Sequence, residues 1–474
     1  MKRIFLSLAG IFFISIVDVP RVMAQSEEGR WRPSWDSLKQ HKAPEWLLDA
    51  KIGIQYVGAP RTFNDQDYWN WSRAQQRARQ LAAEEGYESV TEIDRKAKNL
   101  NVDYVWPIEY DDPQSALSAY VDLGAKFIVS MEAAVIYGTE GLRMTNAEIQ
   151  EARRLGLKVG LHYNFQRWGG QPSIGDPGFV NWMIPSLKKA ISETEADFLF
   201  FDGKQLPSSY LKTPHLVSWY YNWAEKNDKE VWVNDDLGSE FGPFEAPCDV
   251  IGFECMTMNG VSARPWLLWD CLRNEWNCWV NEYGMHVRTG DKWEWMYKPT
   301  DELLQVFIDA VSKGGGWLIQ MINTETAWRT LAPIGEWLRI NGEAIYNTRP
   351  YRDAVPNVKT APNREEVKLN GRFDPSLKTQ DWWYKWSFVF KESLKGAPWY
   401  LNKSKDGSTL YAIHWGWPGA SVLLQDIKPV KGSDIYLLGS SDKLKWKQVG
   451  NDVLIQTPKD KPCDYAYSFK VQLK

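Results

Sequence analysis

Eight short apolar segments, most of them ending in a polar or acidic residue, constrain the fold of this chain more than any other feature. Each has the length of a strand, and they begin at Lys51, Lys126, Lys158, Asp197, Val231, Asp249, Asn277 and Gly316. Nearly continuous apolar runs of this kind are typical of strands buried on both faces of a parallel sheet. Helical patterns separate most of them, so the alternation predicts an α/β fold with a (β/α)8-type, TIM-like barrel.

The pattern changes after Tyr351, where short alternating runs replace the long helical segments. Turn signals such as Lys405-Asp406-Gly407 and Pro418-Gly419 divide these runs, as expected for antiparallel strands. We therefore predict a barrel domain over residues 25–351 and a C-terminal antiparallel β-sandwich over residues 352–474.

The first 24 residues have the features of a cleaved secretory signal. Two basic residues, Lys2 and Arg3, precede an apolar run that ends at Val17, and small residues precede a cut after Ala24. The run is shorter than the ~20 residues that a membrane-spanning helix needs. We expect export to the periplasm or the extracellular space, with no membrane partner.

Charge and motif content exclude several classes of function. The 56 Lys and Arg nearly balance the 60 Asp and Glu, without a basic block, which argues against nucleic acid as a partner. The five histidines are scattered without ligand spacing, and phosphate-binding glycine motifs are absent from the sequence, so neither a metal nor a cofactor is expected. The 27 tryptophans suit pyranose rings as readily as a packed core.

Four of the five cysteines fall within 31 residues: Cys248, Cys255, Cys271 and Cys278. Their spacing does not fit the usual zinc pairs. In an exported protein one or two disulfides are plausible, without a pairing that the sequence defines, and a reduced, buried role for all five is the alternative.

Carboxylates at the ends of the predicted strands are the candidate catalytic groups, because barrel chemistry lies at the carboxyl ends of the strands. Asp202 follows the run Phe198-Leu199-Phe200-Phe201 directly, and Glu254 ends a later strand. Two such groups suit glycoside hydrolysis, one as nucleophile and one as general acid/base. Asp270 competes with Glu254 for the acid/base role, and spacing favours Glu254. His162 and Asn164, at the end of the third strand, are candidates to hydrogen-bond sugar hydroxyls.

From about Trp46 to the C-terminus the sequence resembles the α-L-fucosidases of glycoside hydrolase family 29. The resemblance is carried by ADFLFFDG, VWVND, WDC, LLQVFIDAVSKGGGWLIQMIN and IGEWLRINGEAIYNTRP. It implies that Asp202 is the nucleophile of a retaining mechanism. Glu254 lies where many members place the acid/base, and Asp270 falls on the glutamate that others use. Asn234 and Asp235 match the first two residues of the family's Asn-Asp-Arg motif, whose arginine is Asp236 here.

Both histidine motifs that normally hold fucose are replaced, which makes this chain a divergent member. The first predicted strand has no histidine, and the second is followed by MEAAVIYGTEG, which places Glu132 and Tyr137 there. This exchange changes the hydrogen-bonding polarity of the sugar pocket, so the expected glycone is a modified fucose or a related sugar such as L-galactose. The predicted substrate-binding residues are Glu132, Tyr137, His162, Asn164, Trp168, Asn234 and Trp269.

Two hypotheses follow for the function. The first is a secreted retaining exo-glycosidase of α-L-fucosidase type that acts on a terminal α-L-fucosyl or related sugar of an oligo- or polysaccharide by double displacement. The second is a catalytically inactive, fucosidase-like carbohydrate-binding protein, which the altered sugar pocket motivates.

Overall fold

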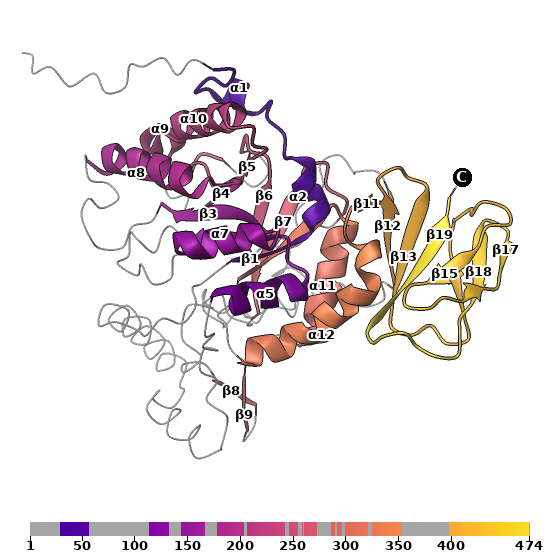
Figure 1. The fold of residues 1–474 in the computed structure, drawn as a ribbon. Coiled ribbons are helices and arrows are strands. Elements are labelled where there is room, and N and C mark those ends of the chain that lie inside the picture. Colours follow the sequence, from indigo (N-terminus) through magenta and orange to yellow (C-terminus); the bar gives the residue numbers. More distant parts are fainter. Residues whose placement is uncertain are drawn as a thin grey trace, which may run out of the picture.

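A computed structural model describes residues 29–55, 113–131, 144–165, 178–202, 206–241, 246–254, 258, 260–272, 286–289, 292–295, 299–320, 325–352 and 398–473 of the chain (Figure 1). Eight parallel strands form one curled sheet with the order β5-β4-β3-β2-β1-β10-β7-β6. The barrel-type fold predicted from the apolar runs is confirmed. Its strands are β1 (Ile52–Gln55), β2 (Phe127–Met131), β3 (Lys158–Asn164), β4 (Phe198–Asp202), β5 (Trp232–Val233), β6 (Ile251–Glu254), β7 (Trp266–Cys271) and β10 (Gly315–Gln320).

The two terminal strands of this sheet, β5 and β6, contact each other through their main chains. A single parallel bridge joins Asn234 to Val250. The backbone N–H groups of Asp249 and Val250 both donate to Val233 O, each at 3.2 Å. We call this junction, residues 232–235 with 249–252, the seam of the barrel.

One strand of the sheet, β7, is not among the eight runs predicted from sequence. It contains Trp266 and Trp269 and lies between β10 and β6. The run that begins at Asn277 was predicted as the seventh strand, and it lies outside the described residues. Trp266, at 1% exposure, packs as a core residue, which is the usual place for an indole in a strand with both faces covered.

Helices connect the strands, and the local sequence explains where they begin and end. Thr145 caps α7, because its hydroxyl accepts from Glu148 N while the Glu148 carboxylate accepts from Thr145 N, a reciprocal capping box. Figure 1 shows α8 and α10 over one part of the sheet and α5, α11 and α12 over another. The helices are α1 (Trp35–Leu38), α2 (Glu45–Ala50), α5 (Pro113–Leu123), α7 (Asn146–Arg154), α8 (Phe179–Thr194), α9 (Ser208–Leu211), α10 (Thr213–Lys226), α11 (Thr300–Ser312), α12 (Glu325–Asn341) and the 3-10 helix η2 (Gly342–Ala344).

Aromatic rings fill the barrel interior and require glycine beside them. Phe198 stacks on Trp232 with ring centroids 4.3 Å apart, and Phe127 meets Phe198 edge to face at 5.7 Å. A Cβ at Gly53 would lie 2.1 Å from the Phe127 ring, and one at Gly160 would lie 2.3 Å from the Phe198 ring. The missing side chains on β1 and β3 therefore make the space that the phenyl rings occupy.

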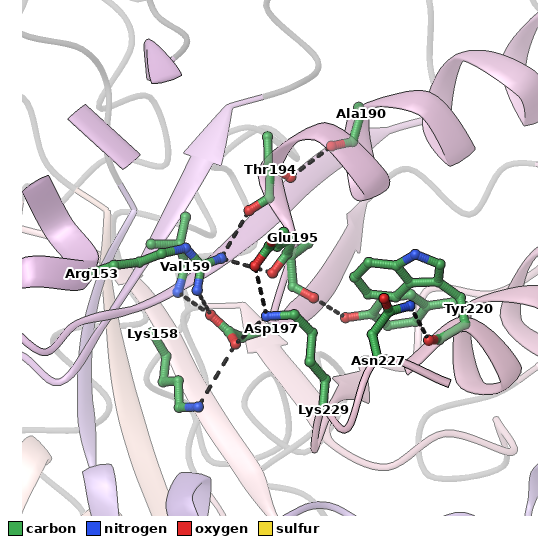
Figure 2. Close-up of polar contacts among 12 residues, drawn as sticks. Arg153, Lys158, Val159, Ala190, Thr194, Glu195, Asp197, Tyr220, Asn227 and Lys229 are labelled. Atoms are coloured by element: carbon green, nitrogen blue, oxygen red, sulfur yellow. Dashed lines mark hydrogen bonds and ion pairs between the residues drawn. The ribbon is translucent and has the colours of Figure 1, made fainter. Parts of the chain in front are cut away.

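The base of β4 carries a buried carboxylate that joins β3 to β4 (Figure 2). Asp197 Oδ2 accepts from Val159 N at 2.9 Å and from Arg153 Nη1 at 3.0 Å. The ammonium groups of Lys158 and Lys229 lie 3.7 and 3.8 Å from Oδ1. This cluster lies at the opposite end of the strand from Asp202.

Antiparallel sheets form the C-terminal region, beside α11 and α12 (Figure 1). A six-stranded sheet has the order β11-β12-β13-β19-β15-β16, and a three-stranded sheet has the order β14-β18-β17. The first strand begins at Thr348, a few residues before the predicted start of the sandwich. The strands are β11 (Thr348–Pro350), β12 (Trp399–Ser404), β13 (Thr409–Trp415), β14 (Ser421–Leu424), β15 (Ile435–Leu437), β16 (Lys443–Leu444), β17 (Trp446–Val449), β18 (Asp452–Gln456) and β19 (Ala466–Gln472); a separate hairpin pairs β8 (His286–Thr289) with β9 (Lys292–Trp295).

Buried hydrogen bonds join this region to the barrel. Trp337 Nε1 donates to Ala466 O at 2.8 Å, and Asn402 Nδ2 donates to Ala344 O at 2.9 Å. Side chains from both regions share one apolar cluster, in which Tyr400 packs with residues of α11 and α12. In the part of the chain that is described, no helix has the length and apolar character to cross a membrane.

Candidate active site

Asp202 lies at the carboxyl end of β4, where the pairing of the strands places it beside Asn164. The two residues are register partners on β4 and β3. Asn164 Nδ2 donates to Asp202 Oδ2 at 2.7 Å. The Asp202 side chain keeps 19% of its surface exposed, so its carboxylate is both oriented and accessible. The structure therefore places these two predicted site residues side by side.

His162 lies two residues before Asn164 on the same strand, buried beneath the carboxylate. Its side chain is 3% exposed, and Nε2 lies 3.6 Å from Asp202 Oδ2. Among the described residues, neither ring nitrogen has a hydrogen-bond partner. Phe200 and Trp269 pack around the ring, with centroids 6.0 Å away in each case. A buried imidazole without partners is costly to the fold, which marks it as a group that a bound ligand would satisfy.

Trp269 and Gln55 complete the floor below these groups. Trp269 is 5% exposed, and its Nε1 donates to Gln55 Oε1 at 2.7 Å. Its ring meets Phe200 edge to face at 5.1 Å. Sequence reasoning missed Gln55, although it ends the apolar part of the first strand in the way that the other candidates end theirs.

Asn234 is hydrogen-bonded to the backbone immediately before Asp202. Its Oδ1 accepts from Phe201 N at 2.6 Å, and its Nδ2 donates to Phe201 O at 2.8 Å. The residue is 2% exposed. Both ends of the predicted sugar-binding amide are therefore used by the protein itself.

Asp235 makes the corresponding contact in the other direction, toward β6. Its Oδ1 accepts from Gly252 N at 2.7 Å, and it is 4% exposed. Lower in the seam, Asp249 Oδ2 accepts from Val233 N at 3.0 Å. Side-chain oxygens thus take the place of ladder hydrogen bonds along the junction of β5 and β6.

The two acid/base candidates occupy different register positions. Glu254 ends β6 and is the register partner of Trp269, whose ring packs inside the barrel. Asp270 is the partner of Ile319, which belongs to the cluster between the sheet and the helices. Asp270 is 4% exposed. Three other predicted substrate-binding residues, Glu132, Tyr137 and Trp168, lie outside the described residues.

Cys248 is a free thiol next to the seam. Its Sγ lies 3.2 Å from Val250 O and 2.8 Å from Arg264 Nη2. Burial raises the pKa of this thiol well above its ordinary value, which keeps it protonated and unreactive. The side chains of Cys255, Cys271 and Cys278 lie outside the described part, so disulfides among those three stay a prediction. Within the described ranges, no group of three or more His, Cys, Asp or Glu side chains is placed to hold a metal ion.

A parallel barrel with an oriented, accessible carboxylate at the carboxyl end of a strand suits a glycoside hydrolase, and comparison with known proteins agrees on that class. Residues 144–343 match the family model described as alpha-L-fucosidase, and residues 391–472 match the model of the alpha-L-fucosidase C-terminal domain. Together the two matches cover more than half of the chain. The chain belongs to the α-L-fucosidase family, glycoside hydrolase family 29.

Relatives are similar over nearly their whole length. The tissue alpha-L-fucosidase of Mus musculus is 23% identical, with 94% of each chain covered. The tissue enzyme of Homo sapiens is 22% identical, over 93% of this chain and 92% of its own. The fold also matches the crystal structure of Thermotoga maritima alpha-fucosidase in complex with fucose, with a TM-score of 0.58, 15% identity and coverage of 93% and 100%.

Proposed function

We propose that the protein is an exported retaining exo-glycosidase that removes a terminal α-L-fucosyl or related, modified sugar from an oligo- or polysaccharide. One observation carries the assignment: Asn164 holds Asp202 at 2.7 Å beside the buried ring of His162, which no described residue hydrogen-bonds. The complex of the Thermotoga maritima relative with fucose supports the choice of sugar. We infer export from the signal over residues 1–24. We also propose a barrel domain over residues 25–351 and a β-sandwich domain over residues 352–474.

In this reaction the Asp202 carboxylate attacks the anomeric carbon, and the bond from that carbon to the leaving oxygen breaks. Glu254 gives its proton to that oxygen. Water then attacks the glycosyl-enzyme ester, Glu254 takes a proton from the water, and Asp202 is released as a carboxylate. Asn164 donates to Oδ2 of Asp202, and His162 lies beside the same oxygen. We therefore assign the attack to Oδ1.

Register supports Glu254 over Asp270 as the acid/base. Side chains alternate between the two faces of a strand, and Trp269 packs inside the barrel. The next residue, Asp270, lies on the same face of β7 as Trp266 and Leu268, which pack against the helices. Glu254 has the phase of Trp269, and we assign the proton transfers to it.

The test is release of the aryl group from an aryl α-L-fucoside and a panel of other aryl glycosides, with protein that begins at Gln25 and its Asp202→Ala variant. We expect turnover by the parent only, with the α-anomer as the first product in an NMR time course. Addition of azide to the variant should restore part of the rate. A β-anomer as first product contradicts the retaining mechanism, and tight sugar binding without turnover supports the inactive binding protein instead.

A further inference from the structure

β5 lies between β4 and β6, the two strands that end in the proposed catalytic carboxylates, and it forms the seam with β6. The nucleophile strand β4 pairs with β5 only at Phe198 with Trp232 and Leu199 with Val233. Beyond those pairs, Asn234 turns to bridge Val250 on the opposite side. On the side of β5, the last residues of β4 have thus lost their neighbouring strand, whereas β3 stays paired with β4 as far as Asp202.

The side chain of Asn234 supplies the missing ladder. Its amide offers one acceptor and one donor, and it uses them on the N–H and the C=O of Phe201, at 2.6 and 2.8 Å. Phe201 is bonded directly to Asp202. With Asn164 holding the carboxylate, the nucleophile is fixed through both its backbone and its side chain.

Asp235, the residue after Asn234, makes a similar contact with β6. Asp235 Oδ1 accepts from Gly252 N at 2.7 Å, two residues before Glu254. Space at Gly252 is limited, because a Cβ there would lie 3.3 Å from Phe200 and 3.4 Å from both Asn234 and Asp235. Two consecutive residues therefore hold the ends of β4 and β6 in one arrangement.

We propose that Asn234 and Asp235 are a pair of positioning residues that set the separation of the two catalytic carboxylates across the seam. The idea rests on the proposed function, because it assumes that Asp202 and Glu254 act together. A retaining pair needs carboxyl groups about 5 to 5.5 Å apart, and a misplacement of about 1 Å can cost about a hundredfold in rate. This gives Asn234 a role behind the nucleophile, without direct contact with sugar.

Two aryl α-L-fucosides separate the contributions of the two residues. A 2-chloro-4-nitrophenyl leaving group departs with little help from an acid, whereas the departure of the less acidic 4-methylumbelliferyl group depends more on protonation. We expect Asn234→Ala, which frees the nucleophile strand, to lower kcat/KM for both substrates by a similar factor, at least about tenfold. Asp235→Ala, which frees β6, should lower kcat/KM for the methylumbelliferyl substrate more than for the activated one.

Conservative variants and a matched control separate positioning from stability. Asp235→Asn keeps an oxygen for the Gly252 N–H and should restore most of the activity that Asp235→Ala loses. Should Asn234→Ala fail to fold, Asn234→Asp keeps the acceptor for Phe201 N and removes only the donor. Asp197→Asn changes a side-chain contact between strands at the far end of β4 (Figure 2). It should lower Tm while leaving kcat/KM for both substrates within about twofold.

Three results would overturn the proposal. One is a loss of Tm in the seam variants with unchanged kcat/KM, as in the control. A second is a rise in KM alone for Asn234→Ala, which indicates direct sugar binding. The third is equal loss on both substrates for Asp235→Ala. If the parent enzyme turns over neither fucoside, the proposed function has failed instead, and hydrogen exchange at the amides of Phe201 and Gly252 still tests whether the variants release the strands.

Discussion

His162 is the residue whose environment differs most from an ordinary core position. Both ring nitrogens are buried and have no hydrogen-bond partner in the described part of the chain, and a buried polar atom left unpaired costs about 1 to 3 kcal/mol. An unsatisfied polar group of this kind calls for an explanation such as a ligand. We therefore propose that His162 serves the sugar site.

We predict that His162→Phe, which keeps a flat ring and removes the nitrogens, stabilises the fold and weakens the site. Thermal unfolding should show a higher Tm, by an amount that corresponds to about 1 kcal/mol. The inhibition constant of free L-fucose should rise at least about tenfold, which is about 1.4 kcal/mol. A lower Tm with unchanged fucose affinity would instead make His162 a structural residue.

Residue identity predicted part of the site and could not predict the rest. Asp202, His162 and Asn164 were predicted as site residues because they lie at strand ends, and the structure places them together. Asn234 also ends a strand, so from sequence it looks like a sugar ligand. Only the divergence of β5 from β4 makes its amide a replacement for ladder bonds, and that divergence depends on the whole barrel. Gln55 was missed because the apolar run that contains it continues past it in the sequence, so it did not appear to end a strand.

Among the elements, β7 shows where periodicity stops being informative. Its residues are almost all apolar, and tryptophan suits a binding loop as well as a buried strand. A short apolar run cannot distinguish these by pattern alone. Helices α7 and α11, by contrast, carry local signals at their ends that do not depend on tertiary contacts.

The capping box of α7 gives an element-level prediction. Thr145→Ala removes the acceptor for Glu148 N and a hydroxyl that donates to the Glu148 carboxylate at 2.7 Å. Glu148 is 2% exposed, so the loss falls on a buried group. We expect the free energy of unfolding to fall by about 1 to 2 kcal/mol in a urea titration, with kcat/KM unchanged. Thr145→Ser keeps the hydroxyl and should lose much less; an equal loss would attribute the effect to the methyl group.

For the whole molecule, an ion network ties α2 of the barrel to the C-terminal sheet. Arg349 pairs with Asp49 at 2.9 Å and also contacts Glu45, while Lys405 contacts both carboxylates. Beside them lies Lys51, 3% exposed. Burial, with the nearby charge of Arg349, lowers the pKa of Lys51 to about 7. The charged form of this lysine therefore opposes folding.

Stability should rise with pH in the range that this shift defines. The lysine titrates near 7 when folded and near 10.4 when unfolded, so the unfolded chain binds more protons between those values. The slope approaches 1.4 kcal/mol per pH unit between about pH 7 and 10 and vanishes below about pH 7, on the order of 5 kcal/mol in total. We predict that Lys51→Met raises Tm at pH 6 and removes this part of the pH dependence. A variant as pH-dependent as the parent would place the titration elsewhere.

The glycines opposite Phe127 and Phe198 also govern how this barrel can diverge. A side chain at Gly53 or Gly160 has no room while its phenyl partner is present, and loss of the phenyl ring alone leaves a cavity that costs about 3 to 5 kcal/mol. Each single step is therefore disfavoured although the double exchange can be neutral. At these two places we therefore expect the glycine and its phenyl partner to change together in evolution, so that their history would be recorded in paired substitutions.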